Sequence, residues 1–176
     1  MATIDLIVLG TLKNKALSAY DIQKQVEYRN ISRWVKISTP SIYKKVIQLE
    51  EKGLIKGTAT KEGNMAEKAV YSLTPTGEAE FEKLMLDISA KPINILLDFN
   101  AVIVNLMSLP PDEQILCLDR IEGNIHSLKQ QIEKNISEKN DMPEIPEMGM
   151  VVLRQQFMLV QAIEDWIREL KGNFDN

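Results

Sequence analysis

Four side chains that could contact a polyanion share one face of a predicted helix. They are Ser41, Lys44, Lys45 and Gln48. Their spacing of i, i+3, i+4 and i+7 places them on one side of an α-helix, and no acidic residue falls among them. Lysine ammonium groups neutralise phosphates, whereas serine and glutamine hydrogen-bond to base edges. The pattern therefore favours contact with double-stranded DNA, with an ordinary solvated helix surface as the alternative.

The segment that carries these residues has the start and stop signals of a helix. Thr39 is a suitable N-cap, and Pro40 suits the first helical position. Gly53 follows Lys52, as expected just beyond a helix C-terminus. A separate apolar stripe is expected to face the core, namely Ile42, Val46 and Leu49.

The neighbouring segments predict a small set of helices and one hairpin. A helix is expected within residues 4–12, and a second one is capped by Ser18 and continues to about Tyr28. Strands are expected at 54–58 and 69–74, with turn residues between them at 61–64. Thr74 and Pro75 then begin a fourth helix that runs to about Leu86. Three helices followed by a hairpin form a winged helix-turn-helix, whose third helix usually reads the major groove.

Charge divides the chain into two parts. Residues 1–86 contain 13 basic and 10 acidic residues, whereas residues 87–176 contain 8 and 15. The net charge of −4 argues against a uniformly basic nucleic-acid coat but permits a local basic face. Besides the helix residues, Lys36, Lys61 and Lys68 are expected to contact the DNA backbone.

The N-terminal part resembles a known family in three runs of sequence. These are AYDIQKQV, TPSIYKKVIQLEEKGLIKG and VYSLTPTGEAEF. They are similar to the PadR family of bacterial transcription regulators over roughly residues 4–86. The resemblance implies a winged helix with a helical dimerisation tail. It places Ser41 and Tyr43 on the recognition helix, and Lys61 and Lys68 on the wing. The wing has only Lys68 beside Glu67 before its tyrosine, so we expect a phosphate contact there instead of insertion into the minor groove.

The C-terminal part is predicted to be all helical. Helices are expected at 92–109, at 111–139 and at 150–171, with a loop at 140–149. Their apolar surface exceeds what three helices can easily bury among themselves, which predicts a homodimer, with a closed monomeric bundle as the alternative. A twofold dimer would place two recognition helices about 34 Å apart. The residues predicted for dimerisation are Leu153, Phe157, Val160, Ile163, Trp166, Ile167 and Leu170.

Catalytic, metal and membrane signals are weak. Ser41 and Lys44 match S-x-x-K, but the companion motifs of that enzyme class do not occur. Cys117 and His126 project in different directions from one helix, and a single cysteine with a single histidine gives no metal or disulfide framework. We therefore expect no enzyme, no catalytic residue, no metal and no cofactor. No secretory signal is found, and the most apolar run, 93–109, is too short and polar to span a bilayer, so a cytoplasmic protein is expected.

The sequence thus predicts a mainly α protein with a small β-hairpin wing. A winged helix-turn-helix domain at 1–88 precedes a helical dimerisation domain at 89–176. The function that fits is a homodimeric, sequence-specific DNA-binding transcriptional regulator that recognises a double-stranded DNA operator. Repression follows from the family resemblance alone, and a small-molecule effector is a candidate partner. The alternative is a winged-helix protein-interaction module in a larger assembly, without sequence-specific DNA binding.

Overall fold

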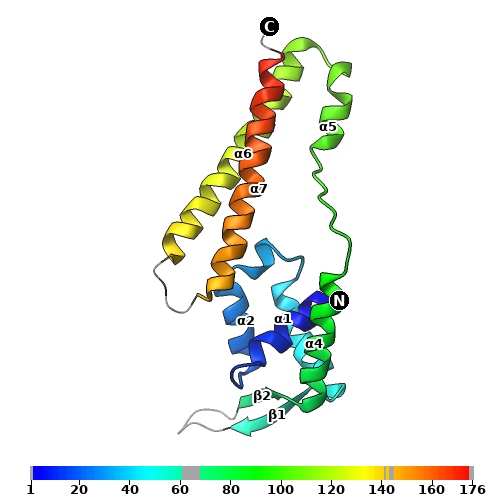
Figure 1. Cartoon of the computed structure of the whole chain (residues 1–176), viewed down its shortest axis with the longest axis vertical. Helices are drawn as coiled ribbons and strands as arrows, with labels where there is room; N and C mark the ends of the chain where they lie inside the picture. The colour runs from blue at the N-terminus through cyan, green and yellow to red at the C-terminus, as the bar shows by residue number, and fades with distance from the viewer. Residues whose placement is uncertain (1, 61–67, 141, 143–144, 175–176) are drawn as a thin grey trace. The chain divides into compact units, whose positions relative to one another are not determined.

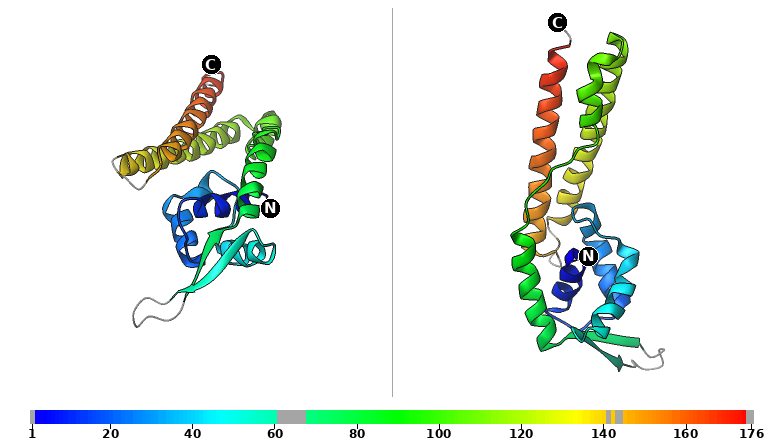
Figure 2. Two further views of the ribbon diagram at one scale, coloured as in Figure 1. Left: turned by 60° about the horizontal axis from the view of Figure 1, so that its bottom comes forward. Right: turned by 90° about the vertical axis from the view of Figure 1, so that its right-hand side faces the viewer.

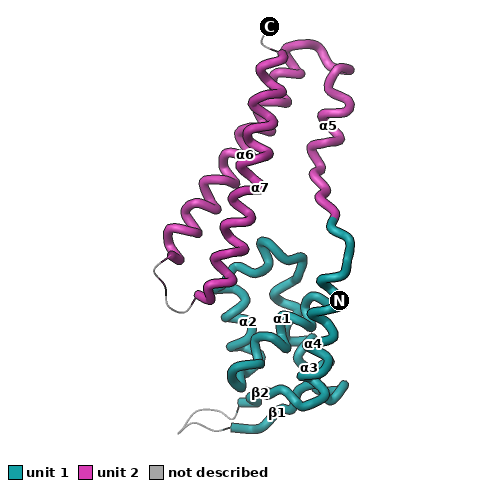
Figure 3. The backbone as a smooth tube through the Cα atoms, in the orientation of Figure 1, with its two compact units in different colours: residues 1–93 teal, residues 94–176 magenta. Residues whose placement is uncertain are grey.

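The computed structural model describes residues 2–60, 68–140, 142 and 145–174. The chain divides into two compact units, residues 1–93 and residues 94–176 (Figure 3). The sequence placed this division at 88/89, so a short segment after the fourth helix falls in the first unit. Each unit has its own hydrophobic core. Among the described helices, none has the length and hydropathy of a membrane-spanning segment.

Unit 1 has the predicted order of helices and strands. Its elements are α1 (Ala2–Leu12), α2 (Ala19–Tyr28), 3₁₀ turns at Ile31–Arg33 and Thr39–Ser41, α3 (Ile42–Glu51), β1 (Ile55–Thr60), β2 (Lys68–Leu73) and α4 (Pro75–Ser89) (Figure 1). The strands are antiparallel, in a register that pairs Ile55 with Leu73 and Thr60 with Lys68. Leu17 adds a short bridge to Tyr71 at the edge of this hairpin. The views in Figure 2 show the hairpin projecting from the helices of this unit. The predicted winged-helix fold is confirmed.

Local capping interactions explain most helix boundaries in unit 1. The Ser18 hydroxyl accepts a hydrogen bond from the Asp21 N–H at 3.1 Å, as the sequence predicted. Gly53, with φ of +70°, ends α3 in the left-handed conformation that favours glycine. The Gly53 N–H donates to the Glu50 carbonyl and the Leu54 N–H donates to the Leu49 carbonyl, which is a Schellman motif.

The beginning of α3 differs from the prediction. Thr39 and Pro40 lie in a 3₁₀ turn instead of at the N-cap and first position of the α-helix. The cause is local, because both the N–H and the hydroxyl of Ser41 donate to the Ser38 carbonyl and close a tight turn there. The α-helix proper therefore begins at Ile42.

One side of α3 packs into the hydrophobic core of unit 1. The predicted apolar stripe of α3 is fully buried, with Ile42, Val46 and Leu49 all at 0% exposure. These side chains belong to one cluster with residues of α1, α2 and β1, including Val8, Leu9, Ile22, Val26 and Ile55. The inner face of α3 is thus fixed, and only its other face remains free.

A compact junction joins the end of α3, the hairpin and α4. The Thr74 hydroxyl accepts from the Gly77 N–H at 3.0 Å and donates to the carbonyl oxygens of Gly53 and Leu54 at 2.7 and 3.1 Å. The Thr74 N–H also donates to the Leu54 carbonyl. A Cβ at Gly77 would lie only 1.9 Å from the Leu54 oxygen. The junction therefore requires glycine at position 77.

Unit 2 is an antiparallel pair of long helices preceded by a shorter one. Its elements are α5 (Asn100–Asn105), a 3₁₀ turn at Leu106–Ser108, α6 (Pro111–Lys139) and α7 (Glu147–Gly172). α6 and α7 run side by side in Figures 1 and 2. The long helix predicted at 92–109 is wrong, since the α-helix covers only Asn100–Asn105 and is followed by the 3₁₀ turn at Leu106–Ser108. A helix that is apolar on nearly all sides must be enclosed, and here Ile95 and Leu96 stay 65% and 87% exposed.

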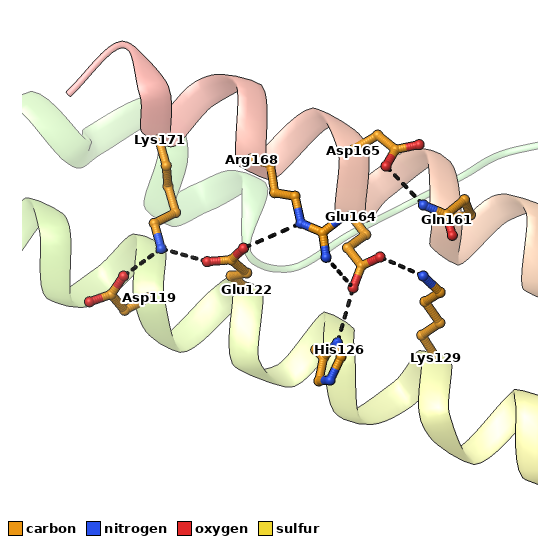
Figure 4. Close-up of polar contacts among 9 residues, drawn as sticks. All are labelled: Asp119, Glu122, His126, Lys129, Gln161, Glu164, Asp165, Arg168 and Lys171. Atoms are coloured by element: carbon orange, nitrogen blue, oxygen red, sulfur yellow. Dashed lines mark hydrogen bonds and ion pairs between the residues drawn. The ribbon is translucent and has the colours of Figure 1, made fainter. Parts of the chain in front are cut away.

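A polar network links α6 to α7 beside their apolar core (Figure 4). Glu164 is fully buried, yet its carboxylate accepts a 2.7 Å hydrogen bond from Lys129 and lies 3.1 Å from His126 Nδ1. Arg168 lies 3.1 Å from the same carboxylate. The hydrogen bonds from Lys129 and His126 hold the pKa of Glu164 below its ordinary value.

A second polar cluster between α6 and α7 is centred on Lys171. Its ammonium binds the carboxylates of Asp119 and Glu122, and these hydrogen bonds raise the pKa of Lys171.

The Gly77 junction gives a stability prediction. Gly77→Ala should lower the free energy of unfolding of unit 1 by about 3 kcal/mol, because the new methyl group overlaps the Leu54 carbonyl and the backbone must move. Urea unfolding followed by Trp34 fluorescence in a Trp166→Phe background measures this unit. Gly123→Ala in α6 is the control, because a Cβ there meets nothing within 4 Å. Equal stabilities of the two variants would contradict the packing at Gly77.

The Glu164 network predicts a pH dependence. Its lowered pKa means that the carboxylate stabilises unit 2 above the ordinary glutamate pKa, near 4.5, and that this contribution disappears as pH falls through the folded-state value. Glu164→Gln should therefore destabilise unit 2 at pH 7 but much less at pH 3. Trp166 fluorescence in a Trp34→Phe background reports the unfolding. Glu169→Gln, on the exposed side of α7, should show no such pH-dependent difference.

Candidate nucleic-acid interface

The exposed face of α3 is partly the one that the sequence predicted. Lys44 is exposed, and Tyr43 is 48% exposed. Ser41 and Gln48 lie at the edges of this face and are half-buried. Ile47 is 52% exposed one turn after Tyr43 and thus belongs to the outer face, although the spacing argument had not selected it. The outer face of α3 is therefore centred on Tyr43, Lys44 and Ile47.

Lys45 lies on the inner side of α3, in contrast to the expectation of an exposed cation. It is 8% exposed, and its ammonium approaches Asp5 Oδ1 of α1 to 2.7 Å. Asp5 Oδ1 is itself buried, so the ammonium of Lys45 compensates the charge of this carboxylate away from water. Because successive residues of an α-helix are about 100° apart around its axis, Lys45 points in a different direction from Lys44. The prediction that both lysines share an exposed face is wrong for Lys45.

The other predicted backbone contacts come from loops and the wing. Lys36 is exposed in the connection between α2 and α3. Lys68 is exposed at the first position of β2, where its carbonyl accepts a hydrogen bond from the Thr60 hydroxyl at 3.2 Å. Lys61 lies outside the described residues. Their contact with DNA stays a prediction.

The wing is anchored to α3 by one side chain. Glu50, near the end of α3, accepts a 2.8 Å hydrogen bond from the Gly57 N–H of β1. The Tyr71 ring lies against the same glycine, and a Cβ at Gly57 would be 2.6 Å from Glu50 Oε1 and 3.1 Å from that ring. Burial, followed by the negative charges of Glu50 and Tyr43, raises the pKa of Tyr71. The hairpin and the outer face of α3 are thus held as one surface.

The residues predicted for dimerisation divide into two groups. Leu153, Val160 and Ile167 are already buried in the single chain, the last two in the core shared with α6. The others are partly accessible, and Trp166 stacks on Phe99 with ring centroids 5.9 Å apart. Sequence periodicity could not separate these groups, because both lie on the apolar side of α7. The apolar residues of α7 that the structure leaves most exposed are Met148, Val151, Met158, Leu159 and Trp166.

The fold and the outer face of α3 define a winged helix-turn-helix protein with a separate helical unit. Residues 8–83 match the family described as "Transcriptional regulator PadR-like family". The resemblance predicted for this part of the sequence is confirmed, because the segment is similar to the PadR-like family. No curated protein sequence matches the chain significantly.

Solved structures of the same fold cover nearly the whole chain. The structure of Bacillus subtilis PadR in complex with operator DNA has 20% sequence identity and a TM-score of 0.82. The alignment covers 98% of this chain and 99% of that chain. The complex of B. subtilis PadR with p-coumaric acid has 17% identity and a TM-score of 0.82, with 98% of this chain and 96% of that chain covered. The virulence activator AphA of Vibrio cholerae has 18% identity, a TM-score of 0.72 and 98% coverage of both chains. At these identities the likeness shows a shared fold.

The matched family is one of regulators and not of enzymes. Among the described residues, no group of three or more His, Cys, Asp or Glu side chains could hold a metal ion. His126 and Cys117, both on α6, have structural surroundings: His126 joins the Glu164 network, and Cys117 packs partly against the core of unit 2.

The different positions of Lys44 and Lys45 predict different effects on stability. Lys45→Met should lower the free energy of unfolding of unit 1 by about 2 kcal/mol, because it leaves the Asp5 carboxylate buried without its cation. Lys44→Met should change it by less than about 0.5 kcal/mol, as is usual for exposed positions. Urea unfolding of the single variants and of the Asp5→Leu, Lys45→Met double variant measures this difference. The double variant should recover part of the lost stability, and a Lys45→Met protein as stable as Lys44→Met would contradict the buried pair.

Proposed function

We propose that this chain is a sequence-specific DNA-binding transcriptional regulator that acts as a homodimer. The observation that carries the proposal is the outer face of α3, which is free of the core and presents Lys44 between two large side chains. A helix held in this way can enter the major groove, while Lys44 and Lys36 meet phosphates. Ser41, Tyr43 and Gln48 are proposed for contacts to base edges, and Lys68 for a backbone contact. Lys45 has no such role in the proposal.

The homodimer is supported by apolar surface that unit 2 leaves uncovered. Exposed fractions reach 87% at Leu96, 80% at Val104, 77% at Met107 and 70% at Met158. Large apolar side chains exposed in this number on one small unit favour a protein interface. We propose that a second copy of the chain covers it, which would pair two recognition helices for a twofold operator.

The sign of regulation and the effector are further parts of the proposal. Repression needs only that the bound dimer occupies its operator, and B. subtilis PadR has been solved on operator DNA. V. cholerae AphA, with the same fold, is called an activator, so a reporter fusion has to decide the sign for this chain. A small-molecule effector stays a prediction. Unit 2 has an apolar cavity of about 590 Å³ beside Trp166, without a charged side chain in its described lining.

The proposal is tested by DNA binding. An operator is first selected from a random duplex library, and fluorescence anisotropy then compares it with a scrambled duplex at several salt concentrations. Binding should be about a thousandfold tighter to the operator and should fall steeply with salt. Lys44→Gln should reduce the slope of log K against log salt by about 1. Lys134→Gln, an equal charge change on an exposed side chain of unit 2, should leave the slope unchanged. Equal, weak binding to both duplexes would instead favour the protein-interaction module.

A further inference from the structure

Two large side chains without a packing role stand on the outer face of α3. Tyr43 and Ile47 are one helical turn apart and are 48% and 52% exposed. Neither belongs to the core of unit 1 or to the partly buried side chains packed against it. The side of α3 that faces the core is already occupied by the buried side chains of Ile42, Val46 and Leu49. The fold of unit 1 therefore gives no reason for an isoleucine at position 47.

The charge around this pair indicates which partner would cover it. Lys44 lies beside Tyr43 on the same exposed turn, and Glu51 follows Ile47 by one turn at the end of α3. The segment 13–68 as a whole is basic, with 12 basic against 6 acidic residues. Single exposed apolar side chains are common on protein surfaces. An apolar pair beside a free ammonium on the helix proposed to enter the major groove is more specific, because that groove offers both phosphates and apolar methyl groups. The charge complementarity favours DNA over an apolar protein surface.

We infer that Ile47 is a specificity-determining residue that contacts the 5-methyl group of thymine, with Tyr43 alongside it. The inference rests on the proposed DNA binding and names the base that α3 selects. Thymine is the base that presents a methyl group in the major groove. Isoleucine has no hydrogen-bonding group, so against adenine, guanine or cytosine it would cover only polar groups and leave them without a partner, whereas thymine offers it a methyl group beside its O4 acceptor. Ile47 thus selects thymine both by burying its methyl group and by penalising the other bases.

The test removes only the methyl group. In the selected operator, each thymine is replaced in turn by uracil, which keeps the base pair and its hydrogen bonds. The wild-type protein should lose about fourfold in affinity at the one or two thymines that face Ile47, the effect of exposing one methyl-sized group. Ile47→Ala should bind the thymine operator more weakly and should show no difference between thymine and uracil at those positions. The readout is the thymine-to-uracil affinity ratio at each position.

Controls separate this inference from general effects. Leu86→Ala removes an equally apolar side chain, 72% exposed on α4, and should leave every thymine-to-uracil ratio unchanged. Urea unfolding should show that Ile47→Ala is folded, as expected for a half-exposed side chain. If the operator is bound specifically but the ratios are the same in wild type and Ile47→Ala, the inference is overturned and the proposed function stands. If no duplex is bound specifically, the proposed function fails and the inference fails with it.

Discussion

The hydrogen bonds of the Thr74 hydroxyl fix the geometry on which the N-terminal unit depends. This one side chain caps α4 through the Gly77 N–H and also binds the carbonyl oxygens of Gly53 and Leu54, just beyond the end of α3. The chain therefore leaves α3, enters the hairpin and begins α4 around a single polar centre. Without this hydroxyl the Gly53 carbonyl would need water or another donor, whereas the Leu54 carbonyl also accepts from the Thr74 N–H. The direction of α3 relative to the wing follows from this arrangement.

Buried charges have structural roles in both units. In unit 1 the Asp5 and Lys45 pair ties α1 to the inner side of α3. In unit 2 the carboxylate of Glu164 joins α7 to His126 and Lys129 of α6. A buried ion pair contributes modestly to stability because desolvation offsets its attraction, but it strongly disfavours arrangements that separate the charges. These pairs therefore restrict how α3 and α7 can rotate about their axes. In α3 that restriction determines which side chains face outward.

The two units leave different surfaces available for partners. Unit 1 exposes a face that is basic and partly apolar on α3, which suits the phosphates and methyl groups of the major groove. Unit 2 exposes apolar side chains along residues 95–107 and α7, which suits another protein surface. A regulator needs both kinds of contact, because DNA specificity improves when two recognition helices are held at a fixed spacing. The separation of the surfaces into two units allows each to be altered without the other.

Features that depend on neighbours a few residues apart could be predicted from the amino-acid sequence. The Ser18 cap, the left-handed Gly53 and the Thr74–Pro75 start of α4 could all be predicted, because each is a hydrogen bond or backbone preference within about one helical turn. The motif order likewise predicted the winged-helix fold and the family. The periodicity of α3 identified its buried stripe, since apolar side chains at helical spacing have one common face.

Features that depend on partners distant in the chain became visible in the folded structure alone. Lys45 turned inward because Asp5, forty positions earlier in the chain, lies against it, and Glu164 is buried because His126 and Lys129 reach it from another helix. The predicted helix at 92–109 is short for the related reason that an apolar helix needs neighbours which unit 2 does not place there. Spacing reports which residues share a face, but burial depends on what packs against that face. For this reason the sequence selected Lys45 for the outer surface, and the structure placed Ile47 there.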